Sequence, residues 1–560
     1  MRPIFLVAAA ILLAGHAAAA ETPKANPANQ ANQACLDCHE ASKPGEAGVR
    51  PAEFLKSVHG DFACTDCHAG YEAPGPHQLA PLEGGEAALA DRHAKSLRPR
   101  RDEKGRVLEP PVGKPLELEA VSAAPRAWLA CGTCHADVTE ALRASVHGRW
   151  LGQDRPVAGP TCADCHGGVH GLAKAEGRGS AEARARSRRC QACHDDPRFT
   201  EAAGLKGDVA VMFRDSIHGR LVALGSERAP SCADCHGSHA IAPRNDPASP
   251  VAAANRAKTC AQCHSGASDN FAAVISHRPL YESDSPIPHF VHVMFSWLTT
   301  LTLLFFAVHV LIDFVYELRK RLARRTEHAH DPEAAVMVQR FDIHQRIQHW
   351  LMLTGVILLG LTGWPLRGAG APEAVETSRK FLALFGGPHG AGLWHRAAAV
   401  MIIVSGAYHL FYLTFLATKK RLPLSMLPGP KDAIDIRDNL LYMLGLRKEK
   451  PRFDRYNYLE KFDYWAVFWG IVMMVGSGFV YWFPVFFARF LPHWVLASAQ
   501  IVHGEEATLA ILFLFCVHFY NVHLKPSIFP MSWIWLNGQI SLEAMRDEHP
   551  AEYERMKSGK

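Results

Sequence analysis

The chain has 560 residues, more than one ordinary domain needs, and its composition changes along its length. The first half is polar and rich in Cys, His, Pro and Gly, whereas the part from about residue 290 onward is strongly apolar and aromatic. The formal net charge of +5 is small for this length and argues against a nucleic-acid partner.

The N-terminal segment predicts an export signal. It reads MRPIFLVAAAILLAGHAAAA, with one Arg, a short apolar run and small residues up to Glu21. The apolar run is too short for an anchor helix, because crossing a bilayer needs about 20 apolar residues. We therefore expect residues 1–20 to be a signal peptide and residues 21–289 to be an exported, periplasmic domain.

Fourteen of the 15 cysteines fall into seven C-x-x-C-H units. This motif is the attachment signature of c-type haem, in which two thiols bond the porphyrin edge and the adjacent His binds the iron. A structural zinc site or a single redox dithiol would not need a His after every pair. The sequence therefore predicts seven c haems, attached at Cys35, Cys38, Cys64, Cys67, Cys131, Cys134, Cys162, Cys165, Cys190, Cys193, Cys232, Cys235, Cys260 and Cys263. Their proximal iron ligands are His39, His68, His135, His166, His194, His236 and His264.

Histidine is the better candidate for the second ligand of each iron, because residues 21–289 contain a single methionine, Met212. The pattern S-[VI]-H-G recurs at 57–60, 145–148 and 216–219, and histidines also follow closely after several C-x-x-C-H units. We read this as three tandem two-haem repeats, near 35–77, 131–170 and 190–239, and a half-repeat at 260–277. The candidate ligands are His59, His77, His147, His170, His218, His239 and His277, which leaves His93 and His289 over.

Two consequences follow for the exported domain. So many porphyrins leave little apolar side chain for a core, so we expect short helices and loops wrapped around the haems. An iron with two histidines has no open position for a substrate, so this domain should conduct electrons rather than transform a small molecule. The insert at 78–127, rich in Pro, Gly and charges, is expected to be an extended loop or a partner contact.

Five apolar segments are each long enough to cross a bilayer, at about 290–316, 347–366, 392–417, 463–483 and 498–522. Haem c is attached outside the cytoplasm, so the first span should run inward. The loops at 317–343 and 418–462 carry six and eleven Lys or Arg residues, against three and one at 367–391 and 484–497, in agreement with the positive-inside rule. The predicted fold is mainly α: a loop-rich multihaem c domain, then a first span at 290–316, a membrane domain at 317–530 and a cytoplasmic tail at 531–560.

Histidines inside the spans predict b haems, because such residues are costly in a membrane and are usually functional. His395 and His409 are 14 residues apart on the third span, within about 40° of the same face. His503 and His518 are 15 apart on the fifth, within about 60° of each other. Two such helices can hold two stacked haems. His395 and His503 would bind the outer haem, and His518 would bind the inner haem with either His409 or His349.

Four motifs in this half resemble the dihaem cytochrome b subunits of respiratory formate dehydrogenases and nickel–iron hydrogenases. They are RIQHW at 346–350, LWHR at 393–396, RYN at 455–457 and VHGEEATLAILFLFCVHFYNVHLKPSIFP at 502–530. The resemblance covers about 180 residues. It implies that His349 and His518 hold the inner haem, with His409 beside it or in a proton path. The spacing in the fifth span is one residue longer than in that family, and the first span is an addition.

The same resemblance implies a menaquinone site next to the inner haem, with an Asn in the loop before the fourth helix, here Asn457. Asn457, His518 and His409 are therefore candidate residues of the quinone site, to which His309 and Asp313 are added. His309 and Asp313, an i, i+4 pair in the first span, could pass protons or could be packing residues. Glu505 and Glu506, after His503, are expected to be solvated at the outer interface or to line a second proton route.

The sequence thus favours a quinol:acceptor oxidoreductase of the bacterial inner membrane. Menaquinol would be oxidised in the membrane, and electrons would pass through two b haems and seven c haems to a periplasmic cytochrome or reductase. The reverse direction, a relay or anchor subunit of a larger complex, and a terminal reductase with one open c haem are the alternatives. Homo-oligomerisation is left open.

Overall fold

The computed structural model describes residues 32–33, 35–36, 49–67, 131–132, 134–150, 159–166, 171–172, 180–205, 208–274, 277, 279–282, 284–324, 332–420, 422 and 424–558. The predicted signal peptide at 1–20, the insert at 78–127 and the candidate ligands Cys38, His39, His68, His77 and His170 lie outside these residues, as does the side chain of Cys67. The chain divides into two compact units, residues 1–175 and 176–560.

The first unit contains short helices in the part of the chain that is described. They are α2 (Pro51–Phe54), α3 (Cys64–Cys67), α6 (Ala136–Ala144), the 3-10 turn η2 (Gly148–Trp150) and α7 (Cys162–His166). The second unit begins in the same way, with α8 (Ala181–His194), α9 (Pro197–Ala202), α10 (Val209–Asp215), α11 (Ile217–Ala223), α12 (Cys232–His236), α13 (Arg256–Ala261), α14 (Asp269–Ala272) and η4 (Leu280–Glu282). Short helices separated by loops are the architecture expected for the haem c segments.

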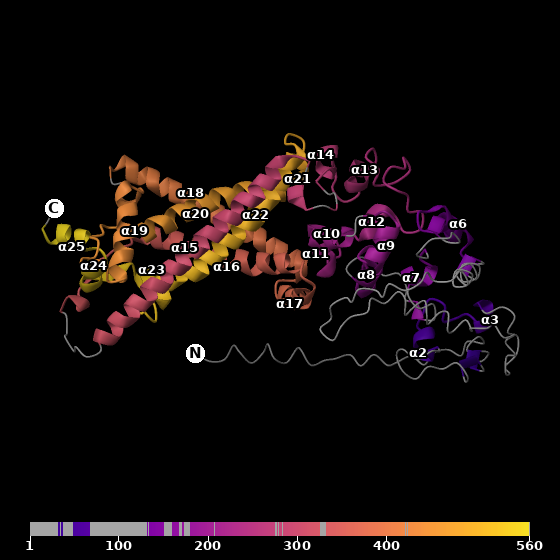
Figure 1. Cartoon of the computed structure of the whole chain (residues 1–560), viewed down its shortest axis with the longest axis horizontal. Helices are drawn as coiled ribbons and strands as arrows, with labels where there is room; N and C mark the ends of the chain where they lie inside the picture. The colour runs from indigo at the N-terminus through magenta and orange to yellow at the C-terminus, as the bar shows by residue number, and fades with distance from the viewer. Residues whose placement is uncertain are drawn as a thin grey trace, which may run out of the picture. The chain divides into compact units, whose positions relative to one another are not determined.

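The five predicted spans are confirmed, and each is longer than expected. They are α15 (Pro286–Arg324), α16 (Ile343–Gly368), α18 (Gly387–Thr418), α20 (Tyr458–Trp482) and α22 (His493–Phe513), which continues through the π-helical turns η7 (Leu514–His518) and η8 (Tyr520–Leu524). Figure 1 shows them running alongside one another in the second unit. The fold is mainly α and the protein is a membrane protein, since all five helices are long and apolar enough to cross a bilayer.

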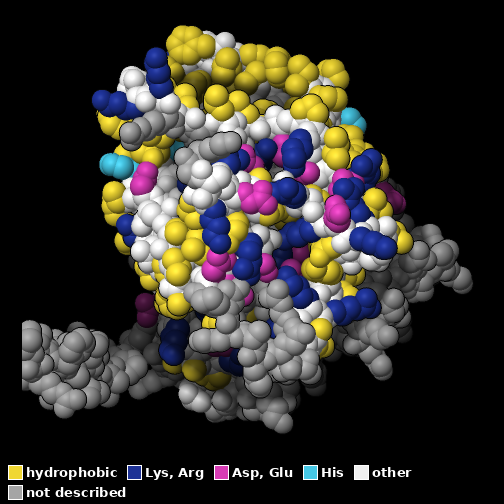
Figure 2. All heavy atoms as spheres, turned by 90° about the vertical axis from the view of Figure 1, so that its left-hand side faces the viewer, with side chains coloured by type: hydrophobic (Ala, Val, Ile, Leu, Met, Phe, Trp, Pro, Cys, Tyr) yellow, Lys and Arg dark blue, Asp and Glu magenta, His cyan; other side chains and the backbone are white. Residues whose placement is uncertain are grey.

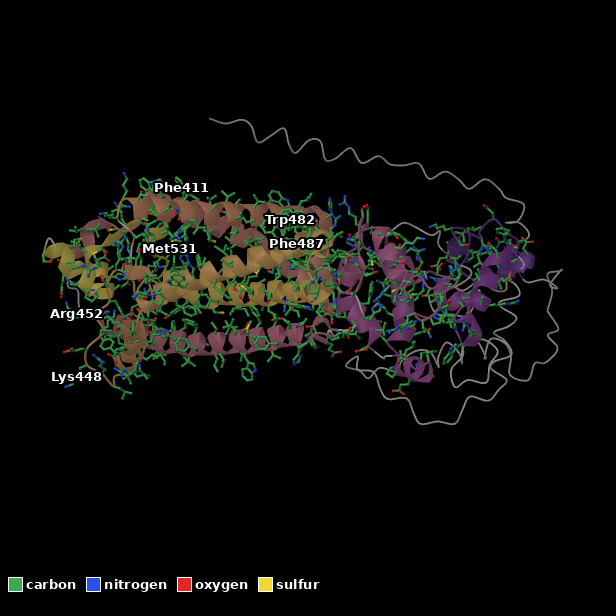
Figure 3. The ribbon with its side chains drawn as sticks, turned by 90° about the horizontal axis from the view of Figure 1, so that it is seen from above. Phe411, Lys448, Arg452, Trp482, Phe487 and Met531 are labelled. Atoms are coloured by element: carbon green, nitrogen blue, oxygen red, sulfur yellow. The ribbon has the colours of Figure 1, made fainter. Side chains whose placement is uncertain are left out.

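The helices pack in pairs and face lipid with the rest of their surface. α16 packs on α18, and α22 packs on both α15 and α20. Large apolar side chains stay outside this packing: Phe411 of α18 is 72 % exposed and lies on the outside of the bundle (Figure 3). Such exposure would be unfavourable in water and suits a hydrocarbon environment.

Capping residues in the sequence explain where several of the helices begin. Asp342 and Gln345 form a reciprocal capping box that begins α16, with the two hydrogen bonds at 2.9 and 3.0 Å. α17 (Pro372–Ala383) and α19 (Pro430–Met443), which connect the spans, both have proline in the first turn, where its missing N–H costs nothing. The shorter elements are α21 (Pro484–Phe487), α23 (Ile534–Asn537), η5 (Pro332–Ala335) and η6 (Leu424–Met426).

The C-terminal segment, expected as a tail, packs against one end of the bundle. β2 (Gln539–Ser541) pairs antiparallel with β1 (Met337–Gln339), and α24 (Leu542–Glu548) and α25 (Pro550–Lys557) follow. Ile540, Met545 and Tyr553 form their small buried core. Figure 2 shows the face at this end, where Lys and Arg side chains are mixed with Asp and Glu. Lys448 and Arg452 mark it, and Trp482 and Phe487 mark the opposite end (Figure 3).

Candidate haem-binding sites

Paired histidines provide a geometric test of haem binding. A ring nitrogen lies about 2.0 Å from the metal it binds and about 1.1 Å from its own ring centre, so two imidazoles on opposite sides of one iron have centres about 6.3 Å apart. Among the described residues, four histidine pairs have centres 6.0–6.4 Å apart. They are His59 with His135, His218 with His264, His236 with His277, and His395 with His503.

The pair inside the bundle joins two membrane helices. His395 of α18 and His503 of α22 have ring centres 6.4 Å apart and ring planes at 62°. Nδ1 of His395 lies 3.0 Å from Thr362 Oγ1, and Nδ1 of His503 lies 3.2 Å from Ser477 Oγ. A metal-binding His is normally oriented by a hydrogen bond to its other nitrogen. Both rings are therefore held with Nε2 left for iron.

Glycines beside these hydroxyls make room for both rings. A Cβ added at Gly363 would lie 3.1 Å from Cε1 of His395, and one added at Gly478 would lie 3.3 Å from Cε1 of His503. Thr362–Gly363 on α16 and Ser477–Gly478 on α20 thus play the same part on two different helices. These polar and small residues stand out in apolar spans, which is the signal that sequence reasoning could have used.

The second set of histidines lies closer to the inner end. Nδ1 of His518 lies 3.1 Å from Asp463 Oδ2, the carboxylate contact expected behind an iron-binding imidazole. His349 interacts electrostatically with both His518 and His523. Its Nδ1 is buried and has no hydrogen-bond partner among the residues that the structure describes. His349 therefore has a ring nitrogen available for iron, and it lies near His518, the other candidate ligand of the inner haem.

His409 differs from His349 in its hydrogen bonds. Its Nδ1 lies 2.8 Å from Gln348 Oε1, and its Nε2 lies 2.8 Å from Tyr464 OH. Because both ring nitrogens are already occupied, binding an iron would require one of these contacts to break. The geometry favours His349 over His409 for the inner site.

The π-helical turns explain the long spacing in the last span. A π turn closes hydrogen bonds between residues five apart and so takes up one residue more than an α turn. Leu514–His518 and Tyr520–Leu524 form such turns. The first of these turns lies between His503 and His518 and takes up the additional residue, so that both histidines can face the bundle interior.

Two of the three S-[VI]-H-G repeats, at 145–148 and 216–219, form the same turn, whereas at 57–60 Ser57 Oγ accepts from the N–H of His59. Ser145 Oγ donates to the carbonyl of Leu142 (2.6 Å) and accepts from the N–H of Gly148 (3.1 Å), and Ser216 makes the same two bonds with Phe213 and Gly219 at the same distances. A Cβ at either glycine would lie within 2.1 Å of a backbone oxygen. The Ser and the Gly thus explain the repeat, and they present His147 and His218 from equivalent turns.

Three described pairs join a candidate second ligand, two of them from S-[VI]-H-G repeats, to a C-x-x-C-H histidine. His59 faces His135 at 6.4 Å, His218 faces His264 at 6.2 Å, and His277 faces His236 at 6.0 Å. His277 adopts a left-handed backbone with φ of 44°, a strained conformation for a non-glycine residue that a functional orientation would justify. None of these pairings could be read from the sequence, since each joins separate segments.

Burial keeps these imidazoles in the form that binds metal. Desolvation, followed by the neighbouring His264, lowers the pKa of His218 to about 4. Desolvation is also the largest cause of the lowered pKa values of His194, His236, His264 and His277. All five are neutral near pH 7, and neutral imidazole is the ligand form.

Thiols of neighbouring motifs lie close together. A hydrogen bond from Cys190, the largest contribution, lowers the pKa of Cys232 to about 7. Burial raises the pKa of Cys162, which is hydrogen-bonded to Cys131, to about 11. No disulfide joins the cysteines in the part of the chain that is described. Their proximity suits haems packed edge to edge. His239 lies 3.4 Å from Ser238 Oγ.

The candidate proton-handling residues are buried. Nε2 of His309 lies 2.7 Å from Tyr458 OH, which also accepts a hydrogen bond from Asn439 (2.9 Å). Asp313 accepts from Tyr520 OH (2.8 Å) and from Lys525 Nζ (2.9 Å). His309 and Asp313 are 3 % and 5 % exposed. They form two polar clusters rather than one continuous chain of hydrogen bonds.

Two other candidates are placed differently from expectation. Asn457 Oδ1 accepts from the N–H of Glu460 at 3.0 Å and caps α20, so its side-chain oxygen is engaged. Glu506 is 4 % exposed, with Oε2 buried and without a hydrogen bond, so the expectation of a solvated carboxylate is wrong for this residue. Glu505 lies 3.5 Å from Arg367.

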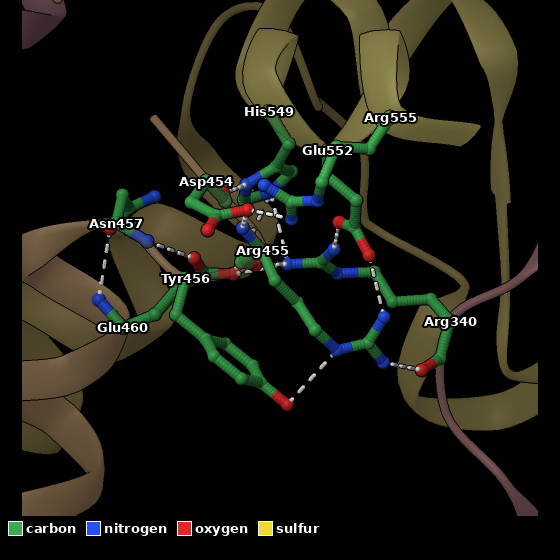
Figure 4. Close-up of polar contacts among 9 residues, drawn as sticks. All are labelled: Arg340, Asp454, Arg455, Tyr456, Asn457, Glu460, His549, Glu552 and Arg555. Atoms are coloured by element: carbon green, nitrogen blue, oxygen red, sulfur yellow. Dashed lines mark hydrogen bonds and ion pairs between the residues drawn. The ribbon is translucent and has the colours of Figure 1, made fainter. Parts of the chain in front are cut away.

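A cluster missed by sequence reasoning joins the inner helix ends to the C-terminal helix (Figure 4). Arg340 is 4 % exposed and pairs with Glu460 and Glu552, each at 3.0 Å. Arg455 also pairs with Glu552 at 2.6 Å, and Nε2 of His549 lies 3.0 Å from Arg340. Arg340 is 120 residues from Glu460 and 212 residues from Glu552 in the sequence, so no local pattern indicates this cluster.

Comparison with known proteins finds similarity in the membrane-spanning half of the chain. The family described as "Prokaryotic cytochrome b561" matches residues 340–529. A protein of Azospira oryzae named "Putative protein-methionine-sulfoxide reductase subunit YedZ1" is 31 % identical over 184 residues, covering 32 % of this chain and 85 % of the relative. The matched region holds all the span histidines of α16 to α22 and excludes α15 and the C-x-x-C-H segments.

Proposed function

The chain belongs to the prokaryotic cytochrome b561 family through its membrane part, and on that premise we propose that it is a menaquinol dehydrogenase of the bacterial inner membrane. Electrons from menaquinol cross the membrane part through two b haems and leave through seven c haems of a periplasmic domain. The observation that carries the proposal is the His395–His503 pair, whose ring centres are 6.4 Å apart on neighbouring membrane helices.

The haems, when bound, supply irons that each take up and release one electron. His395 and His503 hold the outer b haem, with Thr362 and Ser477 fixing their rings. His349 and His518 hold the inner one, with Asp463 behind His518. The buried Nδ1 of His349 and its closeness to His518 support this assignment over His409.

In the c domain, the repeat histidines complete the coordination of irons that the C-x-x-C-H histidines bind from the other side. The described pairs support this for His59, His218 and His277. Two imidazoles on each iron leave no position for a substrate, so the domain conducts electrons to a periplasmic cytochrome or reductase. The small number of Lys and Arg residues in the loops at 367–391 and 484–497 supports its periplasmic side.

Oxidation of one menaquinol to menaquinone releases two electrons and two protons. The inner-end candidates for this site are His309, Asp313, Asn457, His409 and His518. His309 with Tyr458, and Asp313 with Lys525, are buried groups that can accept or pass those protons. The Nδ2 group of Asn457 is the part of that side chain that could donate to a quinone oxygen, since its Oδ1 caps α20.

A second candidate is a relay subunit that passes electrons between quinone and a separate catalytic subunit. The relative from Azospira oryzae favours it, because its name describes a reductase subunit. Purification in native detergent distinguishes the two functions. A stoichiometric catalytic partner supports the relay, and turnover of menaquinol by the isolated chain supports the dehydrogenase.

The proposal is tested by mixing the purified protein, reconstituted in vesicles, with a menaquinol analogue. We expect b haems and then c haems to be reduced, and spectra to give two b and seven c haems. Reduction of neither type by menaquinol, with both reducible by dithionite, would refute the function. Equilibrium potentials of the haems against the quinone pool then give the direction of electron flow.

A further inference from the structure

The segments that carry His218 and His264 meet the bundle end near His503. The two rings have centres 6.2 Å apart and planes at 39°, the separation expected for one iron between them. His264 completes the motif that begins at Cys260, whereas His218 comes from α11, more than forty residues earlier. This site therefore draws its two ligands from separate segments, and each segment has its own contact with the membrane helices.

The His264 segment packs on the start of α22. Phe271 lies 4.9 Å from the His264 ring, centre to centre, and is buried in a cluster with Ala488 and Leu496. Asn270 Nδ2 reaches the carbonyl of Ala488 at 3.5 Å. Leu496 is seven residues before His503 on the same helix, about 10 Å along its axis.

The His218 segment packs on the outer ends of α16 to α18. Leu224 at the end of α11 is 2 % exposed and lies in a cluster with Ala369, Leu382 and Ala391. The His218–His264 site is therefore fixed to the bundle from both sides. A rigid contact of this kind keeps an electron donor and acceptor at a constant distance.

Tyr481 and Arg220 lie between this site and the outer membrane histidines. The ring centre of Tyr481 is 6.1 Å from that of His503. Arg220 lies two residues after His218 and interacts electrostatically with Tyr481. Arg220 also interacts electrostatically with Asp215, and its Nε is buried without a hydrogen-bond partner among the described residues. Tyr481 beside His503 and Arg220 beside His218 thus lead from one histidine toward the other.

We propose that the site held by His218 and His264 is the first c haem to receive electrons from the membrane part, across the contact made by Tyr481 and Arg220. The inference rests on the proposed function and makes it more specific. One electron leaves the outer b haem, which is oxidised, and one c iron is reduced, with no bond made or broken.

The order of electron arrival tests this in the full protein with His218→Met. A His/Met ligand pair raises the potential of an iron above that of a His/His pair, so one c haem acquires its own spectrum. We expect its affinity for an electron to rise about 100-fold, which corresponds to about 120 mV for one electron. The matched control is His277→Met, which alters the neighbouring site at His236.

Electrons are introduced by rapid mixing with a menaquinol analogue. In a second experiment, the protein is reconstituted in vesicles with its c domain on the outer face. Dithionite enclosed inside these vesicles then supplies electrons from the opposite side of the membrane. In His218→Met, the altered haem should be reduced in the same phase in which the b haem is re-oxidised. In His277→Met, it should be reduced in a later phase. Early reduction in His277→Met, late reduction in His218→Met, or no His/Met spectrum in His218→Met overturns the inference. Failure with menaquinol alone counts against the proposed function instead, because dithionite still reports the order of arrival.

Tyr481→Leu is the second variant, and it leaves both ligands in place should His218→Met fail to assemble. We expect transfer from b to c haem to slow about tenfold, because such steps depend steeply on position. Tyr481→Phe keeps the ring and should retain the wild-type rate. An unchanged rate in Tyr481→Leu contradicts the proposed contact.

Discussion

At the scale of single residues, the proposed b-haem ligands differ from His409 because, among the described residues, each keeps at least one ring nitrogen without a protein partner, and for His349 this includes Nδ1. His395, His503 and His518 each have Nδ1 held by a neighbouring oxygen. His409 has both nitrogens engaged by protein groups. The sequence predicts the types of the ligands, because the C-x-x-C-H units and intramembrane histidines have few other uses. It does not predict the hydroxyls and the carboxylate beside them, since these come from other helices.

The inner b haem should depend on His349 and not on His409. His349→Ala removes an imidazole whose Nδ1 has no other use, so the purified variant should contain one b haem instead of two. His409→Ala is the matched control, since it removes an imidazole that Gln348 and Tyr464 already engage. A haem assay that shows the loss in His409→Ala and two b haems in His349→Ala would reverse the assignment.

The hydroxyl behind the outer haem should strengthen haem binding. Thr362→Val keeps the shape of the side chain but removes the contact with His395 Nδ1. Loss of such an outer contact lowers affinity by about 10–100-fold, measurable as faster transfer of b haem to apomyoglobin. Thr414→Val makes the same change where the hydroxyl bonds only to its own helix. Equal haem loss in the two variants would show that Thr362 has no special role.

At the scale of elements, hydrophobic length made all five spans predictable, and cap residues such as Asp342 mark where one of them begins. The π-helical turns of the last span were not predictable, because no local sequence signal distinguishes them from an α-helix. The packing of the C-terminal helices was also not predictable. It depends on charges such as Arg340 and Glu552, which come together only in the folded chain.

Close approach of α20 to α22 should require glycine at one position. Gly478→Val places carbon atoms against the His503 ring, which would be 3.3 Å from the new Cβ, so we expect loss of the outer b haem. Gly476→Val lies on the same helix, where nothing lies within 4 Å of the added Cβ. Its haem spectrum should be normal. Two intact b haems in Gly478→Val would contradict the packing described.

The buried charge cluster should fix α25 to the bundle. Arg340→Gln removes the buried cation between Glu460 and Glu552, while Arg455 stays paired with Glu552. The cost should therefore lie below about 3–5 kcal/mol, the cost of leaving a buried charge unpaired, but above about 1 kcal/mol. We expect earlier thermal unfolding and faster proteolysis of the C-terminal segment. Arg452→Gln breaks an exposed pair with Glu554, and its cost should be below about 1 kcal/mol. Equal stability of the two variants would argue against a role for the cluster.

At the scale of the whole molecule, the chain combines a membrane part that matches the cytochrome b561 family with two parts outside the matched region. These two parts are α15 and the C-x-x-C-H segments. α15 adds the buried His309, Asp313 and Glu317 to the bundle. Its length was evident from the sequence, whereas its polar contacts with α20 and the last span were not. The C-x-x-C-H segments add the paired histidines that we propose as ligands of the c haems.

The central claim is that electrons from menaquinol reach the c haems only through the histidine pair in the bundle. The most direct measurement is menaquinol-driven reduction of the c haems in His503→Ala, compared with the wild-type protein. We predict that the variant keeps its seven c haems, reducible by dithionite, but that menaquinol no longer reduces them. Reduction of the c haems by menaquinol at the wild-type rate in His503→Ala would contradict the account.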